Sequence, residues 1–304
     1  MLLKVAKSSV LLVLAASALH ANAFTEQAEM DRKAIIKYFE DKFEDGEKNK
    51  DRFFPYSTDT ELKGFVKGVK HNDFNIGSYA YNQSAKDQYL TFKDGMMPFE
   101  DAVEKGAQLY KKPFANGKSL ADCFPDPTVS NEYPKFDETK KAVVSLTVAV
   151  NNCLTENGEK PWNTKKDDMA SFQGFLGTKA AEAGKVVDVQ INSKEAQDAY
   201  ERGKKYYYSQ RGYLKMSCAT CHVQGAGQRV RNESMSPLLG QMTHWPVFRL
   251  KWDSLGTAER RMSGCIVDQG QKPPKDDSKQ MQEMLYFMGY MSNGMKIDGP
   301  DLRK

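Results

Sequence analysis

Apolar residues recur with the i, i+3, i+4, i+7 spacing of an amphipathic helix at two places in the chain. The first stretch runs from Met30 to Phe43, and the second runs from Ser278 to Ser292 and carries a stripe of methionines. We expect that stripe to be core packing. A brief alternation of aromatic and polar residues at Tyr79 and Tyr81 predicts a short strand. The chain as a whole is predicted to be mainly α-helical.

The first residues have the pattern of a secretory leader. Lys4 and Lys7 precede an apolar run over residues 10–16, and Ala21-Asn22-Ala23 follows as a small-x-small cleavage site. The apolar run is shorter than the roughly 18 residues that a membrane helix needs, and no later stretch reaches that length. We therefore predict a signal peptide at residues 1–23 and an exported chain without a stable membrane span. A retained membrane anchor is the alternative.

The charge balance excludes one broad class of partner. The 44 basic and 40 acidic residues give a net charge of +4, and removal of the leader takes away two lysines. A chain so close to neutral, with no basic run that carries interleaved aromatic residues, gives no indication of nucleic-acid binding.

The run Cys218-Ala219-Thr220-Cys221-His222 carries the clearest chemistry. A Cys-x-x-Cys-His run is typical of covalent attachment of c-type haem. Two cysteines on one helical turn reach the two vinyl groups of a porphyrin, and the histidine offers a nitrogen to the iron. The alternatives are a redox dithiol in a βαβ setting and half of a zinc site with a second pair nearby. Neither setting is visible in the sequence, so one covalently bound haem c is predicted.

The two halves of the chain repeat the same features in the same order, which indicates an internal duplication. A Glu-x-Gly triplet comes first, and a glycine then lies six residues before the first cysteine. Another glycine lies five residues after the last cysteine, and an acidic pair then leads into an apolar helical stretch. The first half contains Glu104-Lys105-Gly106, Gly117, Cys123, Cys153, Gly158 and Asp167-Asp168, and the second contains Glu201-Arg202-Gly203, Gly212, Cys218, Cys265, Gly270 and Asp276-Asp277.

The duplication predicts two cytochrome c-like domains, at residues 24–185 and 186–304. The first domain is predicted to lack haem, because Cys123 is followed by Phe-Pro-Asp-Pro where the second half has the rest of its haem motif. With no porphyrin between them, and in an oxidising compartment, Cys123 and Cys153 are predicted to form a disulfide. Two free thiols are the alternative.

Cys265 is then the remaining cysteine, and an odd cysteine in an exported protein calls for an explanation. It lies 43 residues after His222, about where a small cytochrome c places its second axial ligand. The repeat favours Cys265 in that role, because its counterpart Cys153 must also lie near the lost haem site. The other candidates are Met262, Met281 and His244.

Basic residues surround Cys265 in the sequence. Arg260 and Arg261 lie just upstream, with Arg249 and Lys251 further back. Cationic neighbours favour the thiolate form of a cysteine and hold anions. Because an electron carrier seldom needs a thiolate ligand, this setting predicts chemistry at sulfur. The alternative is a solvated basic patch around a buried, inert cysteine.

These residues resemble a known family, the SoxA subunit of the thiosulfate-oxidising SoxAX cytochrome. The likeness runs over most of the exported chain and is sharpest from Cys218 to Gly299. The His-Trp-Pro segment and the Arg-x-x-x-Cys run are more specific than the haem motif alone. The matching pieces are Cys-Ala-Thr-Cys-His at 218–222, His-Trp-Pro-Val-Phe-Arg-Leu-Lys-Trp at 244–252, Gly256-Thr257, Arg260-Arg261 through Cys265, and Tyr-Met-Ser-Asn-Gly at 290–294.

The resemblance implies an enzyme, an L-cysteine S-thiosulfotransferase of the single-haem kind. Such an enzyme joins thiosulfate oxidatively to a cysteine of the SoxYZ carrier protein. By position, Cys218 and Cys221 hold the haem, and His222 and Cys265 are its axial ligands. Cys265 is also the catalytic cysteine, found in the family as a persulfide, and Arg261 matches the arginine that contacts substrate.

The resemblance also implies a partner and a compartment. The partner is SoxX, a small c-type cytochrome that forms a heterodimer with SoxA and accepts its electrons, and the compartment is the periplasm. Two other classes of function stay open: an electron-transfer cytochrome with Met or His as second ligand, and a non-catalytic haem scaffold. His244 is expected to pack against Trp245, with proton donation as the alternative.

Overall fold

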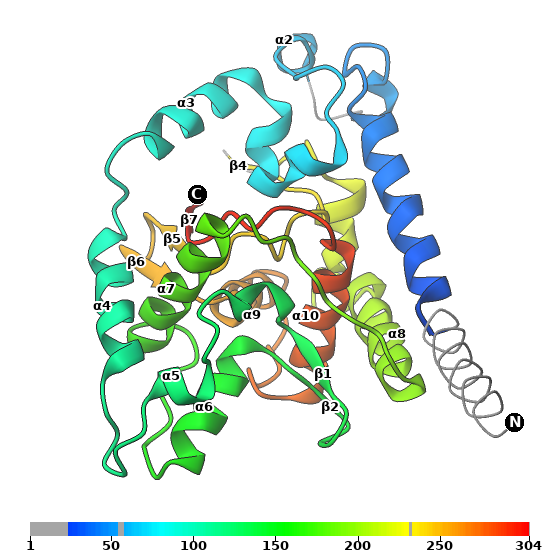
Figure 1. Ribbon diagram of the computed structural model, residues 1–304. Coiled ribbons are helices and arrows are strands. Elements are labelled where there is room, and N and C mark those ends of the chain that lie inside the picture. Colours follow the sequence, from blue (N-terminus) through cyan, green and yellow to red (C-terminus); the bar gives the residue numbers. More distant parts are fainter. Residues whose placement is uncertain (1–23, 54–57, 231–232, 304) are drawn as a thin grey trace, which may run out of the picture.

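The computed structural model describes residues 24–53, 58–230 and 233–303, so the predicted signal peptide at 1–23 lies outside the described residues. Figure 1 shows a mainly helical chain with a few short strands. The chain is also helical over residues 24–42. The further α-helices are α2 (Asp59–Lys63), α3 (Gln83–Lys93), α4 (Glu100–Lys111), α5 (Leu120–Cys123), α6 (Leu146–Glu156), α7 (Asp168–Glu182), α8 (Lys194–Tyr208), α9 (Ala258–Asp268) and α10 (Lys279–Met291).

The remaining regular structure in the described residues consists of 3₁₀-helical and π-helical turns and short strands. The turns are the 3₁₀ segments η1 (Lys50–Arg52), η2 (His71–Tyr81) and η3 (Val129–Glu132), and the π-helical turn η4 (Thr220–Gln224). Two antiparallel pairs join β1 (Lys135–Asp137) to β2 (Ala142–Val144), and β3 (Arg229–Val230) to β4 (Glu233–Ser234). A three-stranded sheet has the order β6 (Ser254–Gly256), β5 (Val247–Arg249), β7 (Asp301–Leu302).

Both helices expected from the apolar period are confirmed. Helical structure covers residues 24–42, which includes nearly all of the first stretch. The second stretch is α10, which is flanked by Ser278 and Ser292, and the Ser278 hydroxyl accepts the backbone N–H of Met281. Its methionine stripe is buried in the hydrophobic core.

The strand expected at Tyr79 and Tyr81 is wrong, because both residues lie in η2. The Asp73 carboxylate accepts the backbone N–H of Lys70 at 2.8 Å and so starts this helix. Gly77, with φ at 64°, joins its two short pieces across a kink that glycine tolerates. The alternation instead reflects ring packing on either side of the turn, since Tyr79 stacks on Tyr89 with the ring centroids 4.7 Å apart.

The duplication is visible at two helix crossings. Gly106 lies where α4 packs on α7, and Gly203 lies where α8 packs on α10. A Cβ atom at Gly106 would be 2.1 Å from the carbonyl oxygen of Ser171, and one at Gly203 would be 2.0 Å from that of Glu283. Only glycine allows such close backbone contact, so the Glu-x-Gly triplets serve the same packing purpose in the two halves.

One of the four repeated features stands at a different distance from the following helix in the two halves. Asp168 is the first residue of α7, whereas Asp276 and Asp277 lie just before the residue that caps α10. Asp276 instead accepts hydrogen bonds from the hydroxyls of Thr164 and Ser263. The two acidic pairs are therefore offset relative to the start of the helix that follows each of them.

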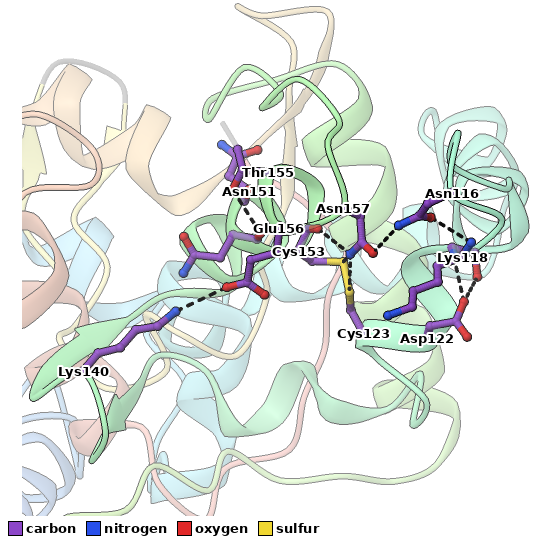
Figure 2. The surroundings of a disulfide bond; sticks show 12 residues. Asn116, Lys118, Asp122, Cys123, Lys140, Asn151, Cys153, Thr155, Glu156 and Asn157 are labelled. Carbon is purple, nitrogen blue, oxygen red and sulfur yellow. Dashed lines mark hydrogen bonds and ion pairs between the residues drawn. A yellow bond between two sulfur atoms is a disulfide. The ribbon is translucent and has the colours of Figure 1, made fainter.

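Cys123 and Cys153 form a disulfide that joins the end of α5 to α6, as the repeat predicted. Their Cα atoms are 6.2 Å apart, and Figure 2 shows the surroundings. The side-chain amide of Asn157 donates to the Cys153 carbonyl at 2.8 Å and in turn accepts from Asn116. The bond thus connects the two elements of the first half that correspond to the haem motif and to α9 in the second half.

Removing this disulfide should lower stability measurably. Cys123→Ser with Cys153→Ser opens a cross-link over a sequence separation of 30 residues. The chain-entropy model gives about 3–4 kcal/mol for a loop of that size. Urea unfolding of the double variant against the unchanged chain measures the loss. Mass mapping that finds both thiols free in the unreduced protein would contradict the assignment.

The described N-terminal residues pack with the second half rather than the first. Phe39, Phe43 and Phe53 belong to the same hydrophobic core as Tyr207 and Met288. A separate core lies under α5, α6 and α7. The division of the chain after residue 185 stays a prediction. Residues 24–53 share the hydrophobic core of the second half.

No helix among the described residues is both long and apolar enough to cross a membrane.

Candidate functional site

A short helical turn presents the Cys-x-x-Cys-His run. Ser217 starts the turn, because its hydroxyl accepts the N–H of Thr220 at 3.1 Å and the Thr220 hydroxyl accepts the N–H of Ser217 at the same distance. The Gly225 N–H then reaches back to the Thr220 carbonyl at 2.9 Å, which widens the turn to the π type. Such turns are frequent at functional sites, and this one fixes Cys221 and His222 relative to one another.

The structure fixes which nitrogen His222 offers. Its Nδ1 lies 2.8 Å from the backbone carbonyl oxygen of Ser236, which can only accept, so Nδ1 carries the proton. Burial lowers the pKa of His222 to about 4, so the imidazole is neutral. A neutral ring with Nδ1–H engaged leaves the Nε2 lone pair for a metal, the arrangement that orients ligand histidines in metalloproteins.

The far end of the same turn is held by a buried lysine. Lys42 donates from Nζ to the carbonyl of Gln224 at 2.9 Å, and its ammonium lies 5.0 Å from the ring centroid of Phe53. Burial lowers the pKa of Lys42 to about 8. Sequence reasoning missed this residue, because a lysine in an amphipathic helix is normally placed in solvent.

A pocket beside the turn gathers most of the candidate residues. Its cavity volume is about 180 Å³. His222, Arg261 and Cys265 all line it. Two of the three rival ligands, Met262 and His244, line it as well. The third, Met281, is fully buried in the core and does not line it.

His244 is a buried, neutral ring at the edge of this pocket. Its ring lies 5.3 Å from that of Trp245, and Nδ1 lies 3.3 Å from the Thr243 hydroxyl. Burial lowers its pKa well below the usual value, and the positive charge of Arg303 adds to this. The packing against Trp245 matches the expectation from sequence.

Helix α9 presents Arg261 and Cys265 one turn apart on the same face, toward the pocket. Arg260 does not line the pocket; its guanidinium lies 4.2 Å from the ring centroid of Trp252 and 3.2 Å from the Ser254 hydroxyl. Within the described parts of the chain, the guanidinium of Arg261 makes no hydrogen bond or ion pair. It is therefore available to an anion in the pocket.

The three free thiols lie within electrostatic reach of one another. Burial raises the pKa of Cys218 to about 12, with a smaller contribution from Cys265. Burial followed by the charge of Cys265 also raises the pKa of Cys221. Cys218 and Cys221 are the two thiols that covalent attachment to a haem requires, and the Nε2 of neutral His222 and the sulfur of Cys265 could bind its iron, so the residues fit that group.

Known proteins share this sequence over most of its length. L-cysteine S-thiosulfotransferase subunit SoxA from Chlorobaculum tepidum is 45% identical over 237 residues, which cover 78% of this chain and 82% of the relative. The chain belongs to the SoxA family. The model of the family described as SoxA/TsdA, cytochrome c domain, matches residues 105–184 and 202–297. In this SoxA chain, the first matched block contains Gly106, at the crossing of α4 and α7, and the second contains Gly203, at the crossing of α8 and α10.

More distant SoxA proteins agree with this assignment. The SoxA subunit from Allochromatium vinosum is 35% identical over 237 residues, covering 78% of this chain and 84% of the relative. Among solved structures, the crystal structure of SoxXA from P. pantotrophus matches with a TM-score of 0.62 and 28% identity. It covers 68% of this chain and 79% of that one. The mainly α, cytochrome c-like fold predicted from sequence is confirmed.

Proposed function

We propose that this SoxA chain catalyses the haem-dependent oxidative conjugation of thiosulfate to a cysteine of a SoxYZ-like carrier protein. The main observation behind this proposal is that Cys265 and Arg261 lie on one face of α9 and line the same pocket as His222. Within the described residues, the guanidinium of Arg261 has no hydrogen bond or ion pair. The names of the SoxA relatives support the same activity.

The cofactor of the proposal is one haem c. Cys218 and Cys221 would hold it covalently, and His222 and Cys265 would bind its iron. Bound there, haem c supplies an iron centre that takes up electrons. The first half contributes no second haem in this proposal, because its equivalent cysteines are joined in the disulfide.

The chain's own residues bind and transfer sulfur. Arg261 holds the sulfonate oxygens of the dianion by parallel N–H bonds, since a guanidinium matches that geometry. The Cys265 sulfur would bond to the sulfane sulfur of thiosulfate with loss of two electrons. The carrier thiol would then attack that sulfane sulfur and release the Cys265 thiolate, which divides one difficult step into two. Overall, thiosulfate and the carrier thiol give the carrier S-thiosulfonate, one proton and two electrons.

The proposal includes a heterodimer and a cellular compartment. The electrons leave to a SoxX-like c-type cytochrome, the kind of partner that the name SoxXA of the solved complex indicates. The leader pattern at residues 1–23 directs the chain to the periplasm, and the Cys123–Cys153 disulfide is in keeping with such an oxidising compartment.

The proposal is tested by Arg261→Ala in the haem-loaded complex. Two charge-assisted hydrogen bonds at about 1.5–3 kcal/mol each are lost, so kcat/KM for thiosulfate should fall by about 100-fold or more. Arg260→Ala is the matched control, because it removes the same charge from α9 at a position that does not line the pocket. If Arg261→Ala instead loses the haem spectrum while activity follows haem content, Arg261 is structural and the substrate role is wrong.

A second candidate function rests on Met262, which lines the same pocket as Cys265. With methionine as the second ligand, the protein would be an electron carrier. Low-temperature EPR separates the two, because a thiolate ligand and a methionine ligand give different low-spin signals. A His/Met signal that disappears in Met262→Leu would favour the carrier.

A further inference from the structure

Glu259 is a buried carboxylate that the proposed reaction does not use. It lies in the first turn of α9, and only 2% of the residue is exposed. Its two oxygens accept hydrogen bonds from the hydroxyls of Ser145 and Thr147 in the first half of the chain, at 2.8 Å and 3.0 Å. The Thr147 hydroxyl accepts from the side-chain amide of Gln173 at 2.8 Å. Two helices of the first half, α6 and α7, thus hold a carboxylate of the second half.

This carboxylate has no cation paired with it. Within the parts of the chain that the structure describes, Glu259 forms no ion pair; burial raises its pKa, and the hydrogen bonds from Ser145 and Thr147 act in the opposite direction. Ser145 is the residue that caps α6, so the carboxylate lies near the N-terminus of α6 as well as in the first turn of α9. Helix N-termini favour negative charge. A buried carboxylate without a cation depends on its hydrogen-bond donors, so the two hydroxyls determine where Glu259 lies.

Other contacts with the first half hold α9 at its start and in its middle. Thr257, which caps α9, donates from its N–H to the Lys165 carbonyl at 3.2 Å and from its hydroxyl to the Thr164 carbonyl at 2.8 Å. The Thr164 hydroxyl donates to Asp276 at 2.5 Å, and Asp276 also accepts from Ser263 of α9 at 3.2 Å. The helix is therefore tied to the first half at its cap, in its first turn and, by way of Asp276, in its middle.

These polar contacts account for half of the buried residues of α9. Four residues of the helix are buried: Ala258 and Ile266 are apolar, and Glu259 and Ser263 are polar. Among the described helices, the extensive crossings are those of α4 with α7 and of α8 with α10, and α9 takes part in neither. The position of α9 therefore depends strongly on its hydrogen bonds to the first half.

The face of α9 that these contacts hold lies opposite the face that lines the pocket. Glu259 and Ser263 are four residues apart and share one face. Arg261 and Cys265 have the same spacing, two residues further along the chain. Two residues correspond to about 200° of rotation around an α-helix. Arg261 and Cys265 line the pocket, whereas neither member of the first pair does. A rotation of α9 within its contacts would therefore move both pocket residues together.

We infer that Glu259 is a positioning residue, through which the first half of the chain fixes Arg261 and Cys265 in the pocket. The inference rests on the proposed function, because it gives Glu259 a part in that reaction. Helices α6 and α7 then contribute to the reaction without lining the pocket. A displacement of about 1 Å in a reacting group costs about 100-fold in rate, so a loosened α9 has a measurable kinetic effect.

The test is Thr147→Val in the haem-loaded complex. Valine has nearly the shape of threonine and removes one of the two hydroxyls that hold Glu259, whereas a change of the buried carboxylate itself endangers folding. Amide hydrogen exchange in peptides that cover residues 258–268 should become faster. The low-spin EPR signal of the haem should broaden, because Cys265 no longer has a single position. The value of kcat/KM for thiosulfate, per bound haem, should fall by about tenfold or more.

Two variants serve as controls. Thr147→Ser keeps the hydroxyl and should restore the exchange, the EPR signal and most of the rate. Thr155→Val makes the same substitution near the other end of α6, where the hydroxyl donates to the Asn151 carbonyl of the same helix. That variant should leave all three measurements unchanged.

A merely structural role for Glu259 gives a different pattern. Thr147→Val would then lower the melting temperature, while exchange in α9, the EPR signal and kcat/KM per haem stay as they were, and the inference would be wrong. A fall in rate with unchanged exchange in α9 would also contradict it. Failure of the proposed function is distinguishable, because Cys265→Ser and Arg261→Ala would then keep full activity, and exchange in α9 would respond to Thr147→Val all the same.

Discussion

Cys265→Ser should reduce thiosulfate conjugation by about 1000-fold or more, the scale seen when an enzyme loses its nucleophile. Serine nearly matches cysteine in size, so the packing of α9 around this half-exposed position should survive. A hydroxyl at neutral pH is a far weaker nucleophile than a thiol and does not carry a sulfane sulfur between two partners. The haem should stay attached, because Cys218 and Cys221 are unchanged.

Two measurements on the haem-loaded complex check this expectation. One is the rate at which a carrier cysteine gains the mass of thiosulfate, and the other is the low-spin EPR signal, which should lose its thiolate character. Val267→Ser is the control, since it adds a hydroxyl at an exposed position on the same helix. Carrier modification at an unchanged rate in Cys265→Ser would eliminate sulfur chemistry at this residue and leave an electron carrier.

Gly203→Ala should destabilise the second half of the chain by about 3 kcal/mol or more, at the upper end of the usual cost of overpacking. The new Cβ would lie 2.0 Å from the Glu283 carbonyl oxygen and 3.1 Å from the Phe287 Cβ, so α8 and α10 must move apart. The obstructing atom is backbone and cannot rotate away. Thermal unfolding of the haem-loaded protein measures the effect, and Gly106→Ala should act similarly at the α4–α7 crossing.

Gly264 provides a control for which we expect a change in stability of the opposite sign. Gly264 lies in α9 with nothing within 4 Å of its added Cβ. There, Gly264→Ala should stabilise by up to about 1 kcal/mol, because alanine is the better helix former. Equal changes in the free energy of unfolding for Gly203→Ala and Gly264→Ala would show that helix propensity governs both sites. The close contact between α8 and α10 would then not be the cause.

The parts predicted best from sequence were those set by short-range chemistry. The Cys-x-x-Cys-His run, the period of α10 and the repeated cysteines need only local spacing to be recognised. The Cys123–Cys153 disulfide followed from comparing the two halves. Arg261 was assigned to substrate through the resemblance to the SoxA family, which has an arginine four residues before its active cysteine.

The parts that could not be predicted depend on contacts between distant segments. The aromatic alternation at Tyr79 and Tyr81 looks like a strand until Gly77 and the opposing rings are known. Nothing local marks Lys42 as buried beneath the haem-motif turn, or Arg303 as part of the pocket. Both reach their positions through packing between segments that lie far apart in the chain, which periodicity does not encode.

The disulfide of the first half has a consequence for how such a protein can evolve. In the second half, the proposed haem would bridge the motif turn to α9, and in the first half Cys123 and Cys153 bridge the corresponding elements directly. A lineage could thus lose the iron cofactor of one half and still keep a covalent connection between the same two structural elements. Descendants of a two-haem ancestor would then need iron for only one centre, and growth under iron scarcity would favour them.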